Sequence, residues 1–569
     1  MRTSDLDRIS GRVIFGIALL VGYFLVYIGP LPFRPLYLPD ETRYAEIPRE
    51  MLATGDWIVP RLNGLRYFEK PVFGYWVTAL SILCFGENRF AVRLPSALAT
   101  GVSAMLIFFI LRRFHHVSSA LLGTAIFLTS LLVYILGVFN LLDAMFSLFV
   151  TASLVCFYFA YQVGGDRERI VWLAAFAVAC GLGFLTKGFL AFAIPAVTIG
   201  PFLLWQKCPK DLFTLSWIPL LVALIIILPW AIMVHLREPD YWRYFIFVEH
   251  FRRFFAADSS SLHPLPFWIF LPCLIGGATP WTFAAMPSMK GLRKAGWRDP
   301  LTRYALCWLL FPFLLLSASK GKLGTYILPC FAPLSLLFTV GLAQSMKELG
   351  PRPFRATAWT CAAFVGLVAA ASTTLPFLHL DSRPVFASEE TWKWGAGCAA
   401  LVGWSAICVF SAHAKSISTG FGLFAVAPVA LMLSAHFIVP ERVVESRAPE
   451  AFIERWAGAI DPEDQIYSTN YLTPAVCWVL KRSDIGILQR GGEFQYGLNY
   501  PDAKHRHIQI SELEKQIHDR TRTRGIVVMV TNNGYSKYQK YLSGPTRMEA
   551  ADGFVFLKYM GPLISPKTP

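Results

Sequence analysis

Charged residues are scarce in this chain of 569 residues. Only 16% are Asp, Glu, Lys or Arg, whereas 55% are hydrophobic, and the mean hydropathy is +0.48. These values exclude an ordinary soluble enzyme and are typical of a membrane protein with many spans. Acidic residues are the scarcer sign, 37 against 52 basic ones, which gives a formal net charge of +15. Basic loops orient a membrane protein, and this excess also favours anionic lipid or phosphate partners.

The signatures of several other protein classes are missing. No Walker loop or dinucleotide-binding glycine pattern occurs, so we expect no nucleotide cofactor. We find no nucleic-acid-binding module, internal repeat or low-complexity tract. Of the eleven cysteines, all but Cys477 lie in or beside apolar segments, and no Cys-x-x-Cys pair occurs. We therefore expect neither a disulfide framework nor a cysteine zinc site.

The N-terminal segment resembles a signal peptide, because Arg2, Arg8 and Arg12 precede an apolar run that begins at Val13. Charged residues follow this run without an A-x-A cleavage pattern, and many apolar segments come later. We therefore expect a retained signal anchor, with the N-terminus in the cytoplasm.

The apolar segments predict thirteen membrane spans. The apolar stretch at 71–85 is short, and a crossing there would place the basic cluster at 112–116 outside, against the usual orientation. We therefore predict an interfacial or partly buried helix there. The spans are predicted at 13–29, 92–111, 119–138, 141–162, 170–185, 188–205, 213–235, 265–285, 301–317, 323–345, 356–376, 394–411 and 419–438.

After Pro440 the sequence becomes mixed and polar. Its pattern predicts an amphipathic helix at 451–460, strands at 465–469, 525–531 and 553–559, and a capping box of Ser511 and Glu514 before another helix. The predicted fold is thus an all-α polytopic membrane domain at 1–438, with an outer loop at 30–91. A small α/β domain follows at 439–569, on the same outer side because the number of spans is odd.

The stretch from Leu38 to Trp76 carries an unusual density of charge for a loop between spans. Pro39 cannot continue a preceding helix, and Asp40 is expected to cap a new one through its side-chain oxygen. Apolar residues then recur at helical spacing up to Leu52, which predicts an amphipathic helix on the membrane surface. Gly55 is expected to end this helix and Gly64 to mark a further turn.

The end of this stretch places Tyr67, Glu69 and Lys70 close together in sequence. An acid beside a base at a membrane boundary suits the binding of a phosphate, alone or with a metal ion. Taken singly, Asp40 is equally well explained as a helix cap, and Lys70 as an interfacial lysine whose ammonium reaches water. The density of charge favours a binding function.

Four further polar elements fall at predicted outer ends of spans. Asp143, in FNLLDAMF, is an acid among apolar residues, where a functional role is the default hypothesis and a solvated turn the alternative. Lys187 is explained equally well by phosphate binding and by an interfacial position. The other two elements are SASKGKLGTY, which contains Lys320, Lys322 and Tyr326, and the loop at 236–264, which contains His250, Arg252 and Arg253.

The basic residues of the loop at 236–264 suit phosphate, since guanidinium groups pair bidentately with phosphate oxygens. His250 together with Glu69 offers the imidazole and carboxylate ligands that suit zinc. Two ligands do not define a metal site, and a lone histidine is more often structural.

The segments PDETRYAEIPREM, GDWIVPRLNG and YFEKPVFGYW resemble, in order and spacing, the first extracytoplasmic loop of the lipid A aminoarabinose transferases. These enzymes are polyprenyl-phosphate-sugar-dependent GT-C glycosyltransferases, like the protein O-mannosyltransferases. SASKGKLGTY is similar to the family's lysine and tyrosine motif. The resemblance covers most of the membrane part, whereas the C-terminal part matches in general layout.

This resemblance implies that 4-amino-4-deoxy-L-arabinose moves from undecaprenyl phosphate to a lipid A phosphate, on the periplasmic side of a Gram-negative inner membrane. Such a modification confers polymyxin resistance. The catalytic residues that we expect are Asp40, Asp143 and Lys70. Substrate or phosphate binding is expected of Glu41, Arg43, Tyr67, Arg253, Lys320, Lys322 and Tyr326, and metal binding, if zinc is used, of Glu69 and His250.

Three readings remain open at this point. A protein O-mannosyltransferase of the same architecture would need Asp40 as an obligate base, because a serine hydroxyl must lose its proton. A phosphate acceptor is already anionic, so Asp40 would then only orient the acceptor or the donor amine. A lipid flippase or transporter is the third reading, although many transporters contain repeats that are not evident here.

Overall fold

The structure is a computed structural model that describes residues 3–214, 217–252, 265–295, 299–380, 383–519 and 521–560. The chain divides into two compact units. Unit 1 comprises residues 1–33 and 93–438, and unit 2 comprises residues 34–92 and 439–569. The polar loop between the first two predicted spans therefore belongs to the same unit as the C-terminal segment.

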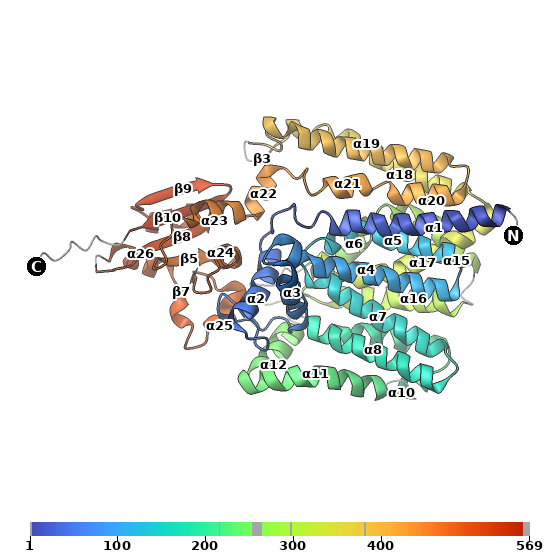
Figure 1. Cartoon of the computed structure of the whole chain (residues 1–569), viewed down its shortest axis with the longest axis horizontal. Coiled ribbons are helices and arrows are strands. Elements are labelled where there is room, and N and C mark those ends of the chain that lie inside the picture. The colour runs from blue at the N-terminus through green and yellow to red at the C-terminus, as the bar shows by residue number, and fades with distance from the viewer. Residues whose placement is uncertain are drawn as a thin grey trace, which may run out of the picture. The chain divides into compact units, whose positions relative to one another are not determined.

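Unit 1 is helical, and its long helices run side by side in Figure 1. Short π-helical or 3-10 segments continue three of them, at Phe24–Ile28 (η1), Tyr244–Arg252 (η2) and Gly324–Cys330 (η5). The main helices are α1 (Thr3–Tyr23), α4 (Arg89–Phe114), α5 (Val117–Leu128), α6 (Leu131–Gly137), α7 (Leu142–Gln162), α8 (Asp166–Lys187), α9 (Leu190–Trp205), α11 (Trp217–Arg237), α12 (Tyr241–Arg243), α14 (Phe270–Gly277), α15 (Ala285–Ala295), α16 (Pro300–Ala318), α17 (Phe331–Leu349), α18 (Arg352–Ser372), α19 (Thr391–His413), α20 (Ile417–Val426) and α21 (Val429–Ser434).

Nine helices among the described residues are long and apolar enough to cross a membrane, and two bent pairs pass the same test together. Two shorter apolar helices, Val13–Ile28 and Leu190–Trp205, coincide with two further predicted spans. Every one of the predicted spans is thus found as an apolar helical segment. The polytopic membrane fold expected from hydropathy is confirmed.

The two bent pairs differ from the straight spans expected at 119–138 and 265–285. The first bends by 66° between α5 and α6, where Thr129 and Ser130 bond back to the carbonyls of Ala125 and Ile126, a local bond that disturbs helices. The second bends by 96° before Pro280, which lacks the N–H that a continuing helix needs. A hydrogen bond of 2.9 Å from Trp281 Nε1 to Thr129 Oγ1 joins the two bends.

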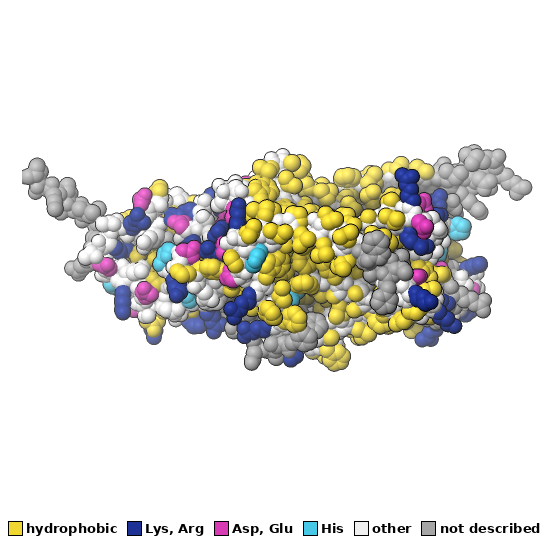
Figure 2. Space-filling model, turned by 90° about the horizontal axis from the view of Figure 1, so that it is seen from below, with side chains coloured by type: hydrophobic (Ala, Val, Ile, Leu, Met, Phe, Trp, Pro, Cys, Tyr) yellow, Lys and Arg dark blue, Asp and Glu magenta, His cyan; other side chains and the backbone are white. Residues whose placement is uncertain are grey.

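Hydrophobic side chains cover the sides of the helical bundle on the face shown in Figure 2. Leu220, Ile225, Leu236 and Leu367 are among the large apolar residues that are more than half exposed. Such a continuous apolar surface is stable in lipid and not in water. Unit 1 is therefore the membrane-embedded part of a multi-pass protein.

Unit 2 contains a six-stranded sheet in the order β7-β6-β5-β8-β10-β9. The first four strands pair in parallel and the last two are antiparallel. The strands are β5 (Gln465–Thr469), β6 (Gly486–Leu488), β7 (His507–Ile508), β8 (Ile526–Thr531), β9 (Arg547–Ala551) and β10 (Phe554–Tyr559). The three strands predicted from the sequence are β5, β8 and β10, and the other three are too short or too polar for their pattern to be noticed.

Helices cover both faces of this sheet (Figure 1). Val527 and Met529 point to a core shared with α23 (Glu450–Ala457) and α24 (Thr473–Leu480), while Val528 and Val530 point to a core shared with α26 (Ile510–His518). This alternation follows from the two-residue period of a strand. The predicted helix at 451–460 is α23. The predicted capping box is wrong, because α26 begins at Ile510 and its N-cap, Gln509, makes no side-chain bond.

The polar loop forms α2 (Asp40–Thr54), a hairpin of β1 (Arg61–Leu62) and β2 (Leu65–Arg66), and α3 (Phe73–Phe85). A small core joins it to the C-terminal segment through Trp478 of α24, which packs with Leu36, Ala45 and Ile82. Gly55 ends α2 in the left-handed conformation that favours glycine, as predicted, and α3 is the short helix expected at 71–85. The interior of unit 2 is thus built from two segments that are far apart in sequence.

Candidate functional site

The expected site residues fall in both units, and each set is described within its own unit. Asp40, Glu41, Arg43, Tyr67, Glu69 and Lys70 belong to unit 2. Asp143, His250, Lys320, Lys322 and Tyr326 belong to unit 1. Arg253 lies outside the described residues.

The first turn of α2 contains two acids with different surroundings. Glu41 is buried and accepts two hydrogen bonds from Arg34, at 2.6 and 3.1 Å, and a third from the Tyr37 backbone N–H at 3.0 Å. Asp40 is 44% exposed at its side chain and pairs with Arg43. The N-cap of α2 is Pro39, so the capping role predicted for Asp40 is wrong, and its carboxylate faces a guanidinium instead.

Arg43 bridges two carboxylates. Its guanidinium is 6% exposed and contacts both Asp40 and Glu493, whose side chain is 40% exposed. Burial alone would lower the pKa of Arg43, but Glu493 and the other nearby acidic groups raise it well above its ordinary value. Arg43 is thus a permanent cation with one flank reached by exposed carboxylates, an arrangement that suits an anionic or zwitterionic ligand.

Glu493 was not anticipated from the sequence. It belongs to a single 3-10 turn, Gly492–Phe494, after a Gly491-Gly492 pair in which Gly492 has a positive φ of 53°. The signal available in the sequence was a polar Gly-Gly-Glu turn shortly after the apolar strand β6. Its pairing with Arg43 joins residues about 450 positions apart, and no local pattern encodes that separation.

The middle of α2 is buried on its charged side as well. Glu46 accepts bidentate bonds of 2.7 and 2.6 Å from Arg49, and Glu50 accepts the Gly64 backbone N–H at 2.9 Å. Burial raises the pKa of Glu46 well above its usual range, against the opposing effect of Arg49. The charged side of this predicted amphipathic helix is therefore buried and paired within unit 2.

The segment from Tyr67 to Lys70 follows the hairpin directly. Tyr67 is buried and donates from its hydroxyl to Glu69 Oε2 at 3.1 Å, and Lys70 Nζ donates to the Glu69 carbonyl at 2.8 Å. Burial raises the pKa of Tyr67 far above its ordinary value, so the phenol stays protonated and remains a donor. Glu69 and Lys70 are both half-buried, so both side chains are partly accessible to solvent.

In unit 1 the structure brings together Asp143, Lys187 and Tyr326. Lys187, at the end of α8, donates to Asp143 Oδ1 in the first turn of α7 at 2.7 Å. The two side chains are 8% and 13% exposed. The Lys187 ammonium lies 4.2 Å from the centroid of the Tyr326 ring, a cation-π distance. Burying an ion pair among apolar helices costs desolvation free energy. Charges in such a position are therefore more often retained for function than for stability.

The two lysines of SASKGKLGTY differ in their surroundings. Lys320 is exposed, whereas Lys322 is buried and donates to the Leu265 carbonyl at 3.3 Å. Burial lowers the pKa of Lys322. The electrostatic attraction between a buried cation and a ligand phosphate is stronger than that between a fully solvated cation and the same phosphate.

The structure does not support His250 as a metal ligand. Its Nδ1 lies 2.7 Å from the Phe245 carbonyl, and its Nε2 accepts the Phe189 backbone N–H at 3.4 Å, so both ring nitrogens face backbone atoms. Across the described ranges, no group of three or more His, Cys, Asp or Glu residues could hold a metal ion. The donor set that the zinc hypothesis requires is therefore not found in the part of the chain that the structure describes.

An α-helical membrane unit with a buried ion pair, together with a charged loop and a C-terminal α/β segment, defines a polytopic membrane enzyme of the GT-C type. Solved structures of ArnT from Cupriavidus metallidurans, one bound to undecaprenyl phosphate and one in the apo state, share this fold with a TM-score of 0.81 at 22% sequence identity. The match covers 98% of this chain and 99% of the other.

Family models match both ends of the chain. Residues 13–245 match dolichyl-phosphate-mannose-protein mannosyltransferase, and residues 444–558 match the C-terminal domain of arabinosyl transferase ArnT. Among curated relatives, the undecaprenyl phosphate-alpha-4-amino-4-deoxy-L-arabinose arabinosyl transferase of Aeromonas salmonicida is 40% identical, over 87% of this chain and 90% of its own. That of Serratia proteamaculans is 36% identical, over 96% and 98%.

This chain belongs to the family of undecaprenyl phosphate-alpha-4-amino-4-deoxy-L-arabinose arabinosyl transferases. The resemblance seen in the first outer loop is thereby confirmed across nearly the whole length of the chain.

Proposed function

We propose that this protein transfers 4-amino-4-deoxy-L-arabinose from undecaprenyl phosphate to a phosphate group of lipid A and so confers resistance to polymyxin and related cationic peptides. The observation that carries this proposal is the continuous match to arabinosyl transferases over both the membrane part and the C-terminal part. The mannosyltransferase model matches residues 13–245 alone. The C-terminal match therefore favours the aminoarabinose reaction over protein O-mannosylation.

The chemistry requires cations where the donor phosphate leaves. As the bond from the anomeric carbon to the phosphate oxygen breaks, negative charge grows on undecaprenyl phosphate, and preorganised cations stabilise it. Lys70 and Arg43 supply such cations in unit 2. We assign phosphate binding also to Arg253 on its sequence position, and to Lys320, Lys322 and Tyr326.

The acceptor needs little activation. A lipid A phosphate is anionic at neutral pH and attacks the anomeric carbon without first losing a proton. Asp40 and Asp143 then serve to orient the sugar, because a carboxylate can pair with the sugar's ammonium group. Tyr67 keeps Glu69 oriented through its hydroxyl, and Glu41 holds the start of α2 through Arg34.

We derive no step through a metal ion. The residues named for it, Glu69 and His250, are held by Tyr67 and by backbone groups, and two ligands leave a zinc site incomplete. Lys70, Arg43 and the other proposed phosphate-binding cations would supply the positive charge that the leaving phosphate needs.

Purified protein incubated with radiolabelled lipid-linked aminosugar tests the activity. Lipid A and a serine-containing peptide are offered in parallel. We expect label on lipid A; label on the peptide would indicate an O-glycosyltransferase, and no transfer to either would indicate a carrier of the lipid-linked sugar.

We also propose that unit 2 lies on the periplasmic side of the bacterial inner membrane. An Ala53→Cys substitution at an exposed position of α2, compared with the parent Cys84→Ser protein that carries the remaining native cysteines, reports the side of the membrane. Labelling of intact cells by an impermeant maleimide is expected. Labelling only after the membrane is opened would overturn both the orientation and the assignment of Lys70 and Asp40 to a periplasmic reaction.

A further inference from the structure

The turn of the β1–β2 hairpin has an unusual backbone. Asn63 and Gly64 are both left-handed, with φ values of 57° and 70°, and Asn63 is fully buried. Asn-Gly is the pair that this type of two-residue hairpin turn favours. A buried turn is uncommon, since the polar backbone of a turn normally faces water. The tip of this hairpin must therefore find its partners inside the protein.

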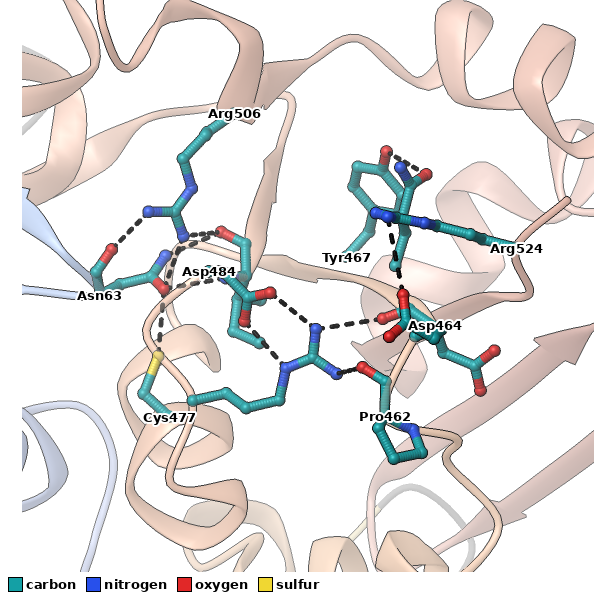
Figure 3. Close-up of polar contacts among 12 residues, drawn as sticks. Asn63, Pro462, Asp464, Tyr467, Cys477, Asp484, Arg506 and Arg524 are labelled. Carbon is teal, nitrogen blue, oxygen red and sulfur yellow. Dashed lines mark hydrogen bonds and ion pairs between the residues drawn. The ribbon is translucent and has the colours of Figure 1, made fainter. Parts of the chain in front are cut away.

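Those partners come from the C-terminal segment (Figure 3). Asn63 donates from Nδ2 to the Ile485 carbonyl at 2.8 Å, and its Oδ1 accepts from the Ile485 N–H at 3.0 Å. Arg506 donates to the Asn63 carbonyl at 2.7 Å and to Asn63 Oδ1 at 2.8 Å. The Cys477 thiol contacts the same oxygen at 3.4 Å. One asparagine is thus held by three residues more than 410 positions away.

Gly64 is enclosed as tightly. A Cβ at this position would lie 2.8 Å from the Ser483 carbonyl oxygen and 3.3 Å from Arg506, and its N–H bonds to Glu50 of α2. The hairpin tip is therefore fastened on one side to α2, whose first turn carries Asp40 and Arg43, and on the other to the C-terminal segment.

The contacts continue along the chain toward Lys70. Arg66 pairs with Asp502 at 3.0 Å and lies 4.1 Å from the centroid of the Tyr500 ring. The ring of Phe68 lies 5.4 Å from that of Tyr496. Residues 477–506 thus form a continuous support for residues 63–68, which end two positions before Lys70.

We propose that Asn63 and Arg506 are positioning residues for the transfer reaction. Arg506 fixes Asn63, Asn63 fixes the hairpin, and the hairpin fixes the path of the backbone into Tyr67, Glu69 and Lys70. This inference rests on the proposed function, because it assigns the phosphate-binding role to Lys70. Catalysis by a cation depends on its placement, and a displacement of about 1 Å costs up to roughly 100-fold in rate.

A cavity beside Arg506 makes this role testable. It has a volume of about 650 Å³, opens to solvent, and is lined by Arg482, Asp484, His505, Arg506 and Arg524. Figure 3 shows Arg524 on the side of Asp464, away from Asn63. Truncation of Arg506 therefore leaves a guanidinium-sized space next to Asn63 that a small solute can reach through the cavity.

The test compares Arg506→Ala with Arg524→Ala in the full-length protein. We expect Arg506→Ala to lower kcat by roughly 10- to 100-fold with little change in the donor KM, because binding groups remain but are misplaced. Added millimolar ethylguanidinium should restore part of this loss. Arg524→Ala, which removes an arginine from the same cavity without touching the hairpin, should have the kcat of the wild type and gain nothing from the solute.

Asn63→Gly is the second variant, since glycine keeps the left-handed backbone and removes only the side chain. It should lower kcat as Arg506→Ala does, without rescue by ethylguanidinium. If Arg506→Ala does not purify as a folded protein, Asn63→Gly alone tests the positioning role. Wild-type kcat in Asn63→Gly, or in folded Arg506→Ala, would overturn the positioning role. Failure of the proposed function is distinguishable, because the wild type itself would then transfer no sugar.

Discussion

The two units of this protein use charge in opposite ways. In unit 1, Asp143 and Lys187 form one ion pair at the ends of apolar helices, with the Tyr326 ring as a close neighbour. In unit 2, the charges of α2 are paired with one another and with residues of the C-terminal segment, as in the contacts of Arg43 with Asp40 and Glu493. The charges of unit 1 form separate pairs, whereas those of α2 in unit 2 form a network.

This difference bears on how each unit responds to substitution. A buried pair that loses one partner leaves an uncompensated charge, whereas a network redistributes its hydrogen bonds. Stability and activity are therefore expected to fall together in unit 1. In unit 2 they should separate, since charges such as Glu41 and Glu46 are paired within the fold, whereas Lys70 is proposed to bind the ligand.

The largest effect is expected for Lys70→Ala. If Lys70 binds the leaving phosphate as proposed, its removal should lower kcat by roughly 100- to 1,000-fold, with an unchanged thermal unfolding midpoint. Lys70→Arg keeps the charge and serves as the matched control, which should retain more activity than the alanine variant. Normal turnover of Lys70→Ala would remove this residue from the phosphate site.

Asp143→Asn should affect both properties of unit 1. Loss of the carboxylate leaves Lys187 unpaired, which should lower the free energy of unfolding by about 3 kcal/mol and kcat by roughly 100-fold. In the double variant Asp143→Asn/Lys187→Met, thermal stability should recover while turnover does not.

Glu390→Gln provides the control for this experiment. Glu390 pairs with Lys393 at 2.7 Å with similarly low exposure, but neither residue belongs to the proposed site. Its loss should lower stability and leave turnover unchanged. Recovery of turnover in the Asp143/Lys187 double variant would mean that this pair is structural only.

Glu41→Gln should have a smaller and different effect. Because Arg34 and the Tyr37 N–H already use its carboxylate, the amide should lower the free energy of unfolding by about 1–3 kcal/mol and lower kcat less than tenfold. Differential scanning fluorimetry and kinetics on the same preparation separate the two quantities. A large loss of kcat at an unchanged melting temperature would instead place Glu41 in contact with the substrate.

The smallest effect is expected for His250→Ala on metal content. Since both ring nitrogens of His250 face backbone atoms, bound zinc measured by mass spectrometry should be equal in this variant and the wild type. Glu69→Gln is measured alongside, as the other residue named for zinc. A lower zinc content in either variant would restore that residue as a ligand.

Much of the fold could be predicted from local patterns. Hydropathy located the spans, Gly55 marked the end of α2, and short runs rich in β-branched and aromatic residues located β5, β8 and β10. The errors also have local causes. Asp40 follows Pro39 as a cap would, but the carboxylate of Asp40 pairs with Arg43 one turn on. The sequence of α2 also does not show that its charged side is buried.

The candidate site was only partly visible in the sequence. The charged residues of 38–76 and the acid at Asp143 stand out because such residues are rare beside apolar spans. Their partners do not stand out. Lys187 is explained equally well as a lysine at the membrane interface. Glu493 lies in a polar turn, and Arg506 is one arginine among many in the C-terminal segment.

The sequence by itself determined the membrane architecture, the family and the chemical nature of the charged loop at 38–76, because hydrophobic runs and ordered motifs are properties of neighbouring residues. Only the tertiary structure decided which charges neutralise one another. Glu41 meets Arg34, Asp143 meets Lys187, and Asn63 meets Arg506 at a separation of 443 residues. The energy of an ion pair or hydrogen bond depends on the distance between its groups in space, and the folded structure sets that distance.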